Sequence, residues 1–424
     1  MSKTQETKGK PTLSGILVDG TIFEQIHNPN WDCNEFVMKK PDGTIETAYR
    51  IKDNSNLDKF IPLNKDAISH GIVVLPDGAG ISMDPTDLFS KISLFIRKYV
   101  DMDEKSIGIS ASYVMMTYLY DKFEKVPYLR FFGLPGTGKS RALLVLRSIC
   151  YHSLNLGASQ TAANLYRSLS TIRTGTLFLD EANFLDTSRT NEFTKLLNDG
   201  YSRDGVVYRC DPKTLVSKPY RVFSPKVLAN HIEFDDPALE SRMLSIELRH
   251  TKRGDIPLSI PDLIMSKDAM ELRNLLTRYR LDNYHSLDLN CKYSELTLFD
   301  HRTQEIALPL LQAQSITKVP AYFLDYLHQA KMKRHERRIF DEDAIIAEIL
   351  IGLIAEGKSS IALSTVQSMA QEKAQIEIPY KRLGYQIRLF GANPTRVTKG
   401  YVYNLQSVDL TYLKNQYDLQ ENID

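Results

Sequence analysis

One stretch of the sequence decides the fold: Gly133-Leu134-Pro135-Gly136-Thr137-Gly138-Lys139-Ser140. It has the pattern G-x-x-x-x-G-K-S and lies between an apolar segment, 128–132, and an apolar stretch of helical spacing, 140–149. Its glycines allow consecutive backbone N–H groups to surround phosphate oxygens, and a helix starting near Lys139 adds the positive end of its dipole. The stretch predicts an ATP-binding loop, with Lys139 at the β- and γ-phosphates and the Ser140 hydroxyl on Mg²⁺. A purely structural glycine turn is the alternative.

About forty residues later, a second apolar segment ends in two carboxylates. Leu177-Phe178-Leu179 is followed by Asp180 and Glu181. A buried strand would place Asp180 beside the phosphates, where it can hold the magnesium shell, and Glu181 can then polarise an attacking water. The alternative is that both acids cap the next helix. The pattern favours ATP hydrolysis over nucleotide sensing.

Two more polar residues lie next to predicted strands. The strand predicted over 221–229 ends in Asn230, which we expect to face the γ-phosphate; otherwise it caps a turn. Twelve residues later, Arg242 immediately precedes the next predicted strand. Such an arginine can project into a neighbouring subunit's nucleotide and neutralise charge on the transferring phosphate. A surface salt bridge is the alternative for Arg242.

Strand and helix patterns alternate from residue 127 to about 248. Strands are predicted at 128–132, 176–179, 220–229 and 243–248, with a further candidate near 151–156, and helices at 140–149, 162–169 and 191–198. Alternation of this kind is typical of a mainly parallel sheet with helices on both faces. The core is therefore expected to be of the α/β class.

The segments 133–140 and 177–181, with Asn230 and Arg242 in this order and spacing, resemble an AAA+ ATPase. More narrowly, 128–132, Ser140-Arg141, 197–201 and 238–242 resemble ATPases of mobile genetic elements, which are grouped with replicative helicases of the minichromosome maintenance and superfamily III types. The resemblance covers roughly residues 88–405. It implies a P-loop AAA+ core with a helical lid, and a homo-oligomeric ring, expected to be a hexamer, that acts on DNA.

A β-hairpin is predicted just before the strand that ends in Asn230. The segments 206–209 and 216–222 flank Asp211-Pro212-Lys213-Thr214. Helicases of the resembled families place such a hairpin in the central pore. The resemblance implies that Lys213, helped by Lys218 and Arg209, contacts the phosphate backbone of a threaded single strand. An ordinary surface loop is the alternative.

The C-terminal region has the element order of a winged helix. Helices are predicted at 343–356, 364–373 and 380–390, and a hairpin at 396–403. Residues 378–405 hold five basic side chains and no acidic one, namely Lys381, Arg382, Arg388, Arg396 and Lys399. This local charge of +5 makes duplex DNA the expected partner. A protein-contact role is the alternative.

The remaining segments carry less chemistry. Residues 13–81 show short strands and turns, typical of a docking or collar module, and 87–123 and 262–330 have helical spacing. Arg302 is the candidate lid arginine that folds over the nucleotide, in competition with Arg273 and Arg278. The predicted divisions are a β-rich module at 1–85, a helical collar at 86–126, the ATPase core at 127–250, the helical lid at 251–340 and the winged helix at 341–424.

Composition excludes several classes of protein. The chain has 424 residues, a formal charge of +1, 42% hydrophobic residues and 25% charged residues, which is ordinary for a folded domain rather than a disordered one. Its four cysteines form no C-x-x-C pair, so zinc and disulfide frameworks are not expected and a reducing cytoplasm fits best. No apolar stretch is long enough to span a bilayer, so no membrane partner is expected.

The sequence thus predicts an ATP-hydrolysing, ring-forming DNA translocase or helicase, or a replication initiator ATPase, of a mobile genetic element. The competing hypothesis is a DNA-bound AAA+ regulator or a protein-remodelling ATPase that unwinds nothing.

Overall fold

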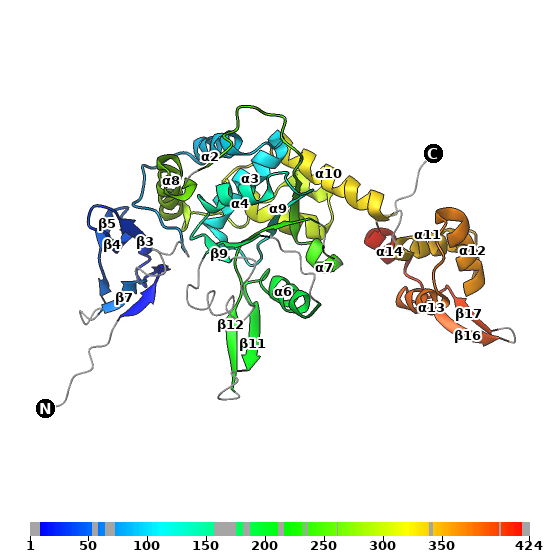
Figure 1. Cartoon of the computed structure of the whole chain (residues 1–424). Coiled ribbons are helices and arrows are strands. Elements are labelled where there is room, and N and C mark those ends of the chain that lie inside the picture. The colour runs from blue at the N-terminus through cyan, green and yellow to red at the C-terminus, as the bar shows by residue number, and fades with distance from the viewer. Residues whose placement is uncertain are drawn as a thin grey trace. The chain divides into compact units, whose positions relative to one another are not determined.

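The computed structural model divides the chain into two compact units, Met1–Phe323 and Leu324–Asp424 (Figure 1). It describes residues 9–52, 58–63, 73–156, 175–180, 187–210, 216–231, 234, 236–260, 262–338, 342–397 and 400–417. This division is coarser than the five segments predicted from sequence and leaves their boundaries as predictions. Each unit is described by itself.

A five-stranded parallel sheet forms the centre of the first unit. Its spatial order is β14-β8-β13-β10-β9, made by β14 (Met243–Glu247), β8 (Tyr128–Phe132), β13 (Lys226–Asn230), β10 (Leu177–Leu179) and β9 (Leu154–Leu156). Most of its residues are buried, which explains the near-continuous apolar runs. The expected α/β core is therefore present, including the candidate strand near 151–156.

Helices pack around this sheet. They are α2 (Pro85–Tyr99), α3 (Glu104–Thr117), α4 (Lys139–Arg147), α6 (Thr187–Asp199), α7 (Pro237–Glu240), α8 (Lys267–Asn283) and α9 (His301–Ala313), with short 3-10 turns η1 (Tyr120–Lys122), η2 (Leu263–Met265) and η3 (Ser294–Leu298). Helix α10 (Ala321–Arg338) spans the boundary between the two units. Helix α3 is buried along most of its length, and its Tyr113 hydroxyl donates to backbone oxygens of Pro127 and Lys226 at 3.1 and 2.9 Å. It therefore fixes the start of two adjacent strands. The helix predicted at 162–169 lies outside the described residues.

The N-terminal segment is rich in strands, as predicted. A four-stranded antiparallel sheet contains β2 (Ser14–Ile16), β3 (Ile22–Asn28), β4 (Cys33–Lys39) and β5 (Ile45–Ala48), and a second sheet contains β1 (Lys10–Thr12), β7 (Asp58–Pro62) and β6 (Ile51–Lys52). The turn between β4 and β5 has Gly43 at φ 88°, a conformation that glycine adopts without strain. Phe23, Phe36 and Ile51 form its small core.

Buried charges join this N-terminal module to the rest of the unit. Glu24 on β3 is 1% exposed and accepts hydrogen bonds from the Tyr151 hydroxyl at 2.8 and 3.0 Å and from Arg280 Nε at 2.5 Å. Arg280, on α8, also forms an ion pair with Asp121 at 2.7 Å. Burial raises the pKa of Glu24 to about 7 against the opposing effect of Arg280, and burial lowers the pKa of His152, 3.4 Å from Glu24, to about 3. Removing Arg280 would leave the carboxylate form of Glu24 buried without a cationic partner.

The second unit packs helices against a small antiparallel sheet. It contains α11 (Glu342–Ala355), α12 (Leu363–Ala374), α13 (Tyr380–Leu389) and α14 (Leu410–Tyr417), with the sheet β15 (Ser360–Ala362), β17 (Gly400–Asn404) and β16 (Asn393–Val397) in that order. The predicted order of three helices and a hairpin is confirmed, whereas β15 and α14 were not predicted. Within the described residues, no helix has both the length and the apolar character needed to cross a bilayer.

Candidate functional site

The loop between β8 and α4 has the backbone that its glycines predict. Helix α4 begins at Lys139, and Gly138 precedes it with φ 92°, while Gly136 has φ 79°. Gly133 has φ 144°, and a Cβ atom there would lie 2.3 Å from the backbone oxygen of Leu248. Because L residues rarely adopt these φ values, the loop depends on glycine at all three positions.

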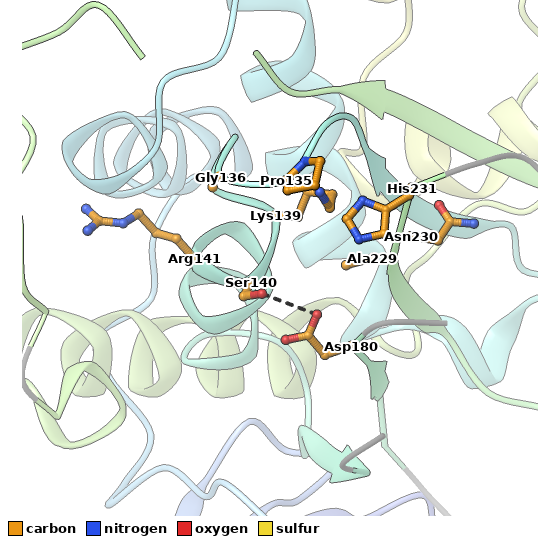
Figure 2. Close-up of a pocket in the computed structure, with 10 residues that line it drawn as sticks. Pro135, Gly136, Lys139, Ser140, Arg141, Asp180, Ala229, Asn230 and His231 are labelled. Atoms are coloured by element: carbon orange, nitrogen blue, oxygen red, sulfur yellow. Dashed lines mark hydrogen bonds between the residues drawn. The ribbon is translucent and has the colours of Figure 1, made fainter. Parts of the chain in front are cut away.

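A cavity of about 390 Å³ lies against this loop (Figure 2). Its lining residues come from the loop, from the start of α4 and from the ends of two strands: Pro135, Gly136, Gly138, Lys139, Ser140, Arg141, Asp180, Ala229, Asn230 and His231. Parallel strands all end at the same edge of the sheet, and β13 lies between β8 and β10. The end of β13 therefore reaches the cavity between the loop and Asp180.

The two predicted magnesium ligands lie together in this cavity. The Ser140 hydroxyl donates to Asp180 Oδ1 at 3.3 Å, as Figure 2 shows. Lys139 is 9% exposed, and its Nζ donates to the backbone oxygens of Gly133 and Leu134, each at 2.8 Å. Glu181, the predicted water-polarising residue, lies outside the described residues.

Asn230 contributes an unpaired acceptor to this region. The residue is 2% exposed, lines the cavity, and its Oδ1 has no hydrogen-bond partner among the described residues. A buried polar atom without a partner costs free energy, so native proteins keep few of them. Figure 2 shows this side chain directed away from Ser140 and Asp180, so it would have to turn before Oδ1 could accept a hydrogen bond from a ligand in the cavity.

Three lining residues were not predicted as site residues: Ala229 and two with polar side chains, His231 and Arg141. His231 follows the last residue of β13, and its Nδ1 lies 3.2 Å from the Gly133 oxygen. Arg141 follows Ser140, and its guanidinium donates to the oxygens of Pro257 and Leu258 at 2.5 and 2.7 Å, which ties the segment after β14 to the cavity wall. The signal for His231 was its place directly after a predicted strand beside Asn230.

Arg242 lies at the amino ends of the sheet's strands, whereas the cavity lies at their carboxyl ends. It precedes β14, which is parallel to β8, so a strand length of roughly 15 Å separates it from the loop. Its Nη1 donates to the backbone and side-chain oxygens of Asn198, and its guanidinium lies 5.2 Å from the centre of the Tyr201 ring. Arg242 therefore cannot contact a nucleotide in the cavity of its own chain.

Arg302 is not at the cavity either. Its guanidinium lies 5.5 Å from the same Tyr201 ring and pairs with Glu305. The expectation that Arg302 folds over the nucleotide of its own chain is therefore not supported by its position. Its two competitors are also engaged elsewhere, since Arg273 donates to the oxygens of Leu75 and Ser148 and Arg278 pairs with Asp282.

The predicted hairpin is confirmed and extends from the sheet (Figure 1). It consists of β11 (Val206–Cys210) and β12 (Ser217–Arg221), paired antiparallel with Arg209 opposite Lys218. Lys218 is exposed, and Tyr208 on β11 is 67% exposed. Lys213 lies outside the described residues.

The basic residues of the second unit are less free than their sequence indicates. Lys381, Arg388 and Arg396 are exposed, and Lys399 lies outside the described residues. Arg382, however, pairs with Glu342 at 2.5 Å and Asp343 at 3.5 Å, both on α11. The local charge of +5 counted along 378–405 therefore overestimates the positive charge of this surface. The fold places two carboxylates from α11 beside Arg382.

Comparisons with known proteins give only distant similarity. No family model and no curated protein matches the chain. Two apo structures of the C-terminal region of NrS-1 are 12% identical to this chain in sequence. Each match covers 91% of this chain and 96% of the NrS-1 chain, and the TM-scores are 0.38 and 0.39. Similarity this low carries no argument about activity, so function must be argued from the site.

Proposed function

We propose that this chain is a magnesium-dependent AAA+ ATPase that forms a ring and translocates on DNA, as the helicase or initiator of a mobile genetic element. One observation carries the proposal. The ends of three neighbouring strands bring Lys139, Ser140, Asp180 and Asn230 to a single cavity, although these residues are spread over about ninety positions of the sequence.

The loop fits the phosphates of a nucleotide. Its glycines hold left-handed or extended backbone, and α4 begins at Lys139, so the N–H groups of the first helical turn, which have no acceptor within the helix itself, lie beside the cavity. Lys139 now donates to two loop carbonyls, which are neutral acceptors. Phosphate oxygens are stronger acceptors for an ammonium group, so Lys139 would turn to the β- and γ-phosphates when ATP is bound.

The Ser140 and Asp180 oxygens fit Mg²⁺. Magnesium prefers oxygen ligands and is commonly held by one or two protein oxygens, with waters and phosphates completing the shell. Among the described residues no group of three His, Cys, Asp or Glu side chains could hold a metal ion, and the proposed site relies on Ser140, Asp180 and the nucleotide's phosphates instead. Bound Mg²⁺ would neutralise charge that develops on the transferred phosphoryl group.

The chain's own side chains would perform the remaining steps. Asn230 Oδ1 can accept a hydrogen bond from the attacking water, since this atom has no other partner among the described residues. Glu181, which follows Asp180 in the chain, is the proposed group that polarises this water. Lys139 compensates negative charge on the phosphates, and the turn around Gly133 and Gly136 holds the loop backbone in position.

Ring formation is supported by the place of Arg242. If Arg242 contacts a nucleotide, that nucleotide is bound by another subunit, because the cavity of its own chain is at the opposite ends of the strands. Active sites would then lie between subunits, and the Asn198 contacts would hold Arg242 in place before assembly. The proposed DNA contacts are the β11–β12 hairpin, for a single strand, and the exposed Lys381, Arg388 and Arg396, for duplex DNA.

The competing function is a DNA-bound regulator or a remodelling ATPase. The ion pairs of Arg382 favour it to a degree, because they leave the second unit with fewer available cations for DNA.

Steady-state ATP hydrolysis with and without single-stranded DNA tests both functions. A translocase should hydrolyse ATP faster with single-stranded DNA, and this activity should disappear in Lys139→Ala but persist in the matched surface variant Lys358→Ala. Hydrolysis that does not respond to DNA would favour the regulator. No magnesium-dependent hydrolysis at all would overturn the proposal.

A further inference from the structure

A second lysine is buried at the start of β13. Lys226 is 0% exposed, and its Nζ donates to the backbone oxygens of Gly200, Val222 and Ser224 at 3.1, 3.1 and 3.0 Å. An ammonium group has three N–H donors, so all of them are used. The face of the Tyr128 ring, 4.8 Å from Nζ, stabilises the cation further. Burial lowers the pKa of Lys226.

The three carbonyls lie on both sides of the β11–β12 hairpin. Gly200 precedes β11, whereas Val222 and Ser224 follow β12, so a single ammonium group joins the two ends of the hairpin. Position 200 is fitted to this contact, because a Cβ there would lie 2.4 Å from Nζ. Gly200 also follows the last residue of α6, where the helix dipole favours a cation.

Stability alone does not explain a lysine here. Lysines are almost never fully buried unless paired, and Lys226 has no carboxylate partner among the described residues. A hydrogen bond from Val222 N to the Gly205 oxygen at 3.2 Å also closes the same end of the hairpin without Lys226.

The other end of β13 is in the cavity. The strand runs from Lys226 to Asn230, a span of roughly 13 Å. It is hydrogen-bonded to β8 on one side and β10 on the other, and the Tyr113 hydroxyl binds both the N–H and the oxygen of Lys226. Strand β13 is therefore a continuous, hydrogen-bonded connection from Lys226 to Asn230 and the adjacent His231.

From these contacts we infer that Lys226 is a positioning residue that couples the β11–β12 hairpin to the nucleotide cavity through β13. DNA bound on the hairpin shifts its two ends, Lys226 transmits the shift to β13, and Asn230 changes position at the cavity. By reciprocity, ATP in the cavity shifts the hairpin. This inference rests on the proposed function, since it takes the cavity as an ATP site and the hairpin as a DNA contact.

Cys210 allows the coupling to be measured directly. It is the last residue of β11 and is exposed, whereas Cys150 is buried and Cys33 and Cys291 are half-buried. With Cys33 and Cys291 changed to serine in the full chain, an environment-sensitive fluorophore can be attached at Cys210. ATPγS should then shift its emission saturably, and an oligothymidylate should raise ATPγS affinity, measured by calorimetry, about fivefold or more.

Three variants separate coupling from folding. Lys226→Met keeps the aliphatic stem but removes the charge, and should reduce both the emission shift and the affinity ratio to background, with ATPγS affinity in the absence of DNA within about twofold of the parent. Lys226→Arg, which keeps a cation with several donors, should recover part of the ratio. Tyr113→Phe removes two hydrogen bonds from the same residue's backbone but leaves the ammonium contacts, so it should keep the full ratio.

Each outcome bears on the inference. An unchanged affinity ratio in Lys226→Met would overturn it, and so would a parent chain that binds ATPγS and DNA without any emission shift. If Lys226→Met does not fold, the inference is tested by the emission shift of the parent and by the ratio of ATPγS affinities with and without DNA in Lys226→Arg. A parent that does not bind ATPγS would overturn the proposed function itself, which is a distinct result.

Discussion

Lys139 and Lys226 are both buried against backbone carbonyls. Lys139 lies beyond the carboxyl ends of the parallel strands, whereas Lys226 lies at their amino ends. Lys139 has an open cavity beside it and donates to two carbonyls of its own loop. Lys226 has no exposed surface and donates to three carbonyls from segments on both sides of a hairpin. The first can exchange its partners for a ligand and the second cannot. What surrounds a buried charge, rather than its burial, separates a binding group from a positioning group.

The largest expected effect is at the cavity edge. Lys139→Ala should weaken ATP binding, while Glu181→Gln should keep binding and lower turnover about 10²-fold or more, because the water then lacks its polarising carboxylate. The melting temperature should change little in Lys139→Ala, since water can enter the cavity and solvate Gly133 and Leu134. Measured kcat and ATP affinity of each variant check this. Near-normal turnover in Glu181→Gln would contradict the assignment of Glu181 as the group that polarises the water.

The second prediction is that Lys139 of one subunit and Arg242 of a neighbouring subunit act at the same nucleotide. Arg242→Ala and Lys139→Ala should each be inactive alone, but mixing them should restore part of the ATPase activity. One type of interface then pairs an intact loop with an intact arginine. The measurement is ATP turnover as a function of mixing ratio, with mixed rings verified by differently tagged subunits. No recovery at any ratio would show that Arg242 does not act between subunits.

The third prediction concerns Glu24, a buried titratable side chain on β3, outside the central parallel sheet. Its folded-state pKa is raised to about 7 from 4.5, so between these values the folded chain holds a proton that the unfolded chain has lost. The contribution of Glu24 to the free energy of unfolding should therefore fall as pH rises through this window, by at most about 1.4 kcal/mol per pH unit. His152, whose pKa is lowered to about 3 from 6.5, contributes in the opposite direction below about pH 6.5, so the parent alone does not isolate Glu24. Glu24→Gln, which cannot titrate, removes the falling contribution, so its free energy of unfolding relative to the parent should rise with pH, whereas that of the exposed-residue control Glu271→Gln should not.

Urea denaturation midpoints at pH 5, 6 and 7 give the measurement. ATP hydrolysis by folded Glu24→Gln should resemble that of the parent at pH 7, because Glu24 does not line the cavity beside Lys139. Identical pH profiles for the parent and Glu24→Gln would mean that Arg280 keeps Glu24 ionised in the folded state.

Sequence patterns predicted what is continuous along the chain. The loop 133–140, the strand before Asp180 and the strand ending at Asn230 each carry a local signal, and parallel pairing brings strand ends together. Lys226 carried no such signal, because its three partners are defined only by the tertiary fold. Arg302 was misplaced because helical periodicity does not tell which edge of a sheet a helix end approaches.

The same reason explains Arg382. Its carboxylate partners Glu342 and Asp343 are about forty residues earlier in the sequence, on a helix whose pattern gave no information about its neighbours. Counting charges in a sequence window therefore overestimated the field around α13. Electrostatic predictions from sequence are safest where the charged residues have no possible partner on an adjacent element.

The smallest expected effect tests this correction on the exposed surface. Duplex affinity should fall with salt, and the slope of log affinity against log salt should decrease by about one unit for each lost phosphate contact. Lys381→Ala and Arg388→Ala should each lower the slope by about that amount. Arg382→Ala should change it less, because Glu342 and Asp343 already neutralise this guanidinium. Glu342→Gln should strengthen duplex binding by releasing Arg382, with Lys358→Ala as the control. Equal slopes for Arg382→Ala and Arg388→Ala would mean that the ion pairs open on DNA, and unchanged slopes in all variants would assign this surface to protein contacts.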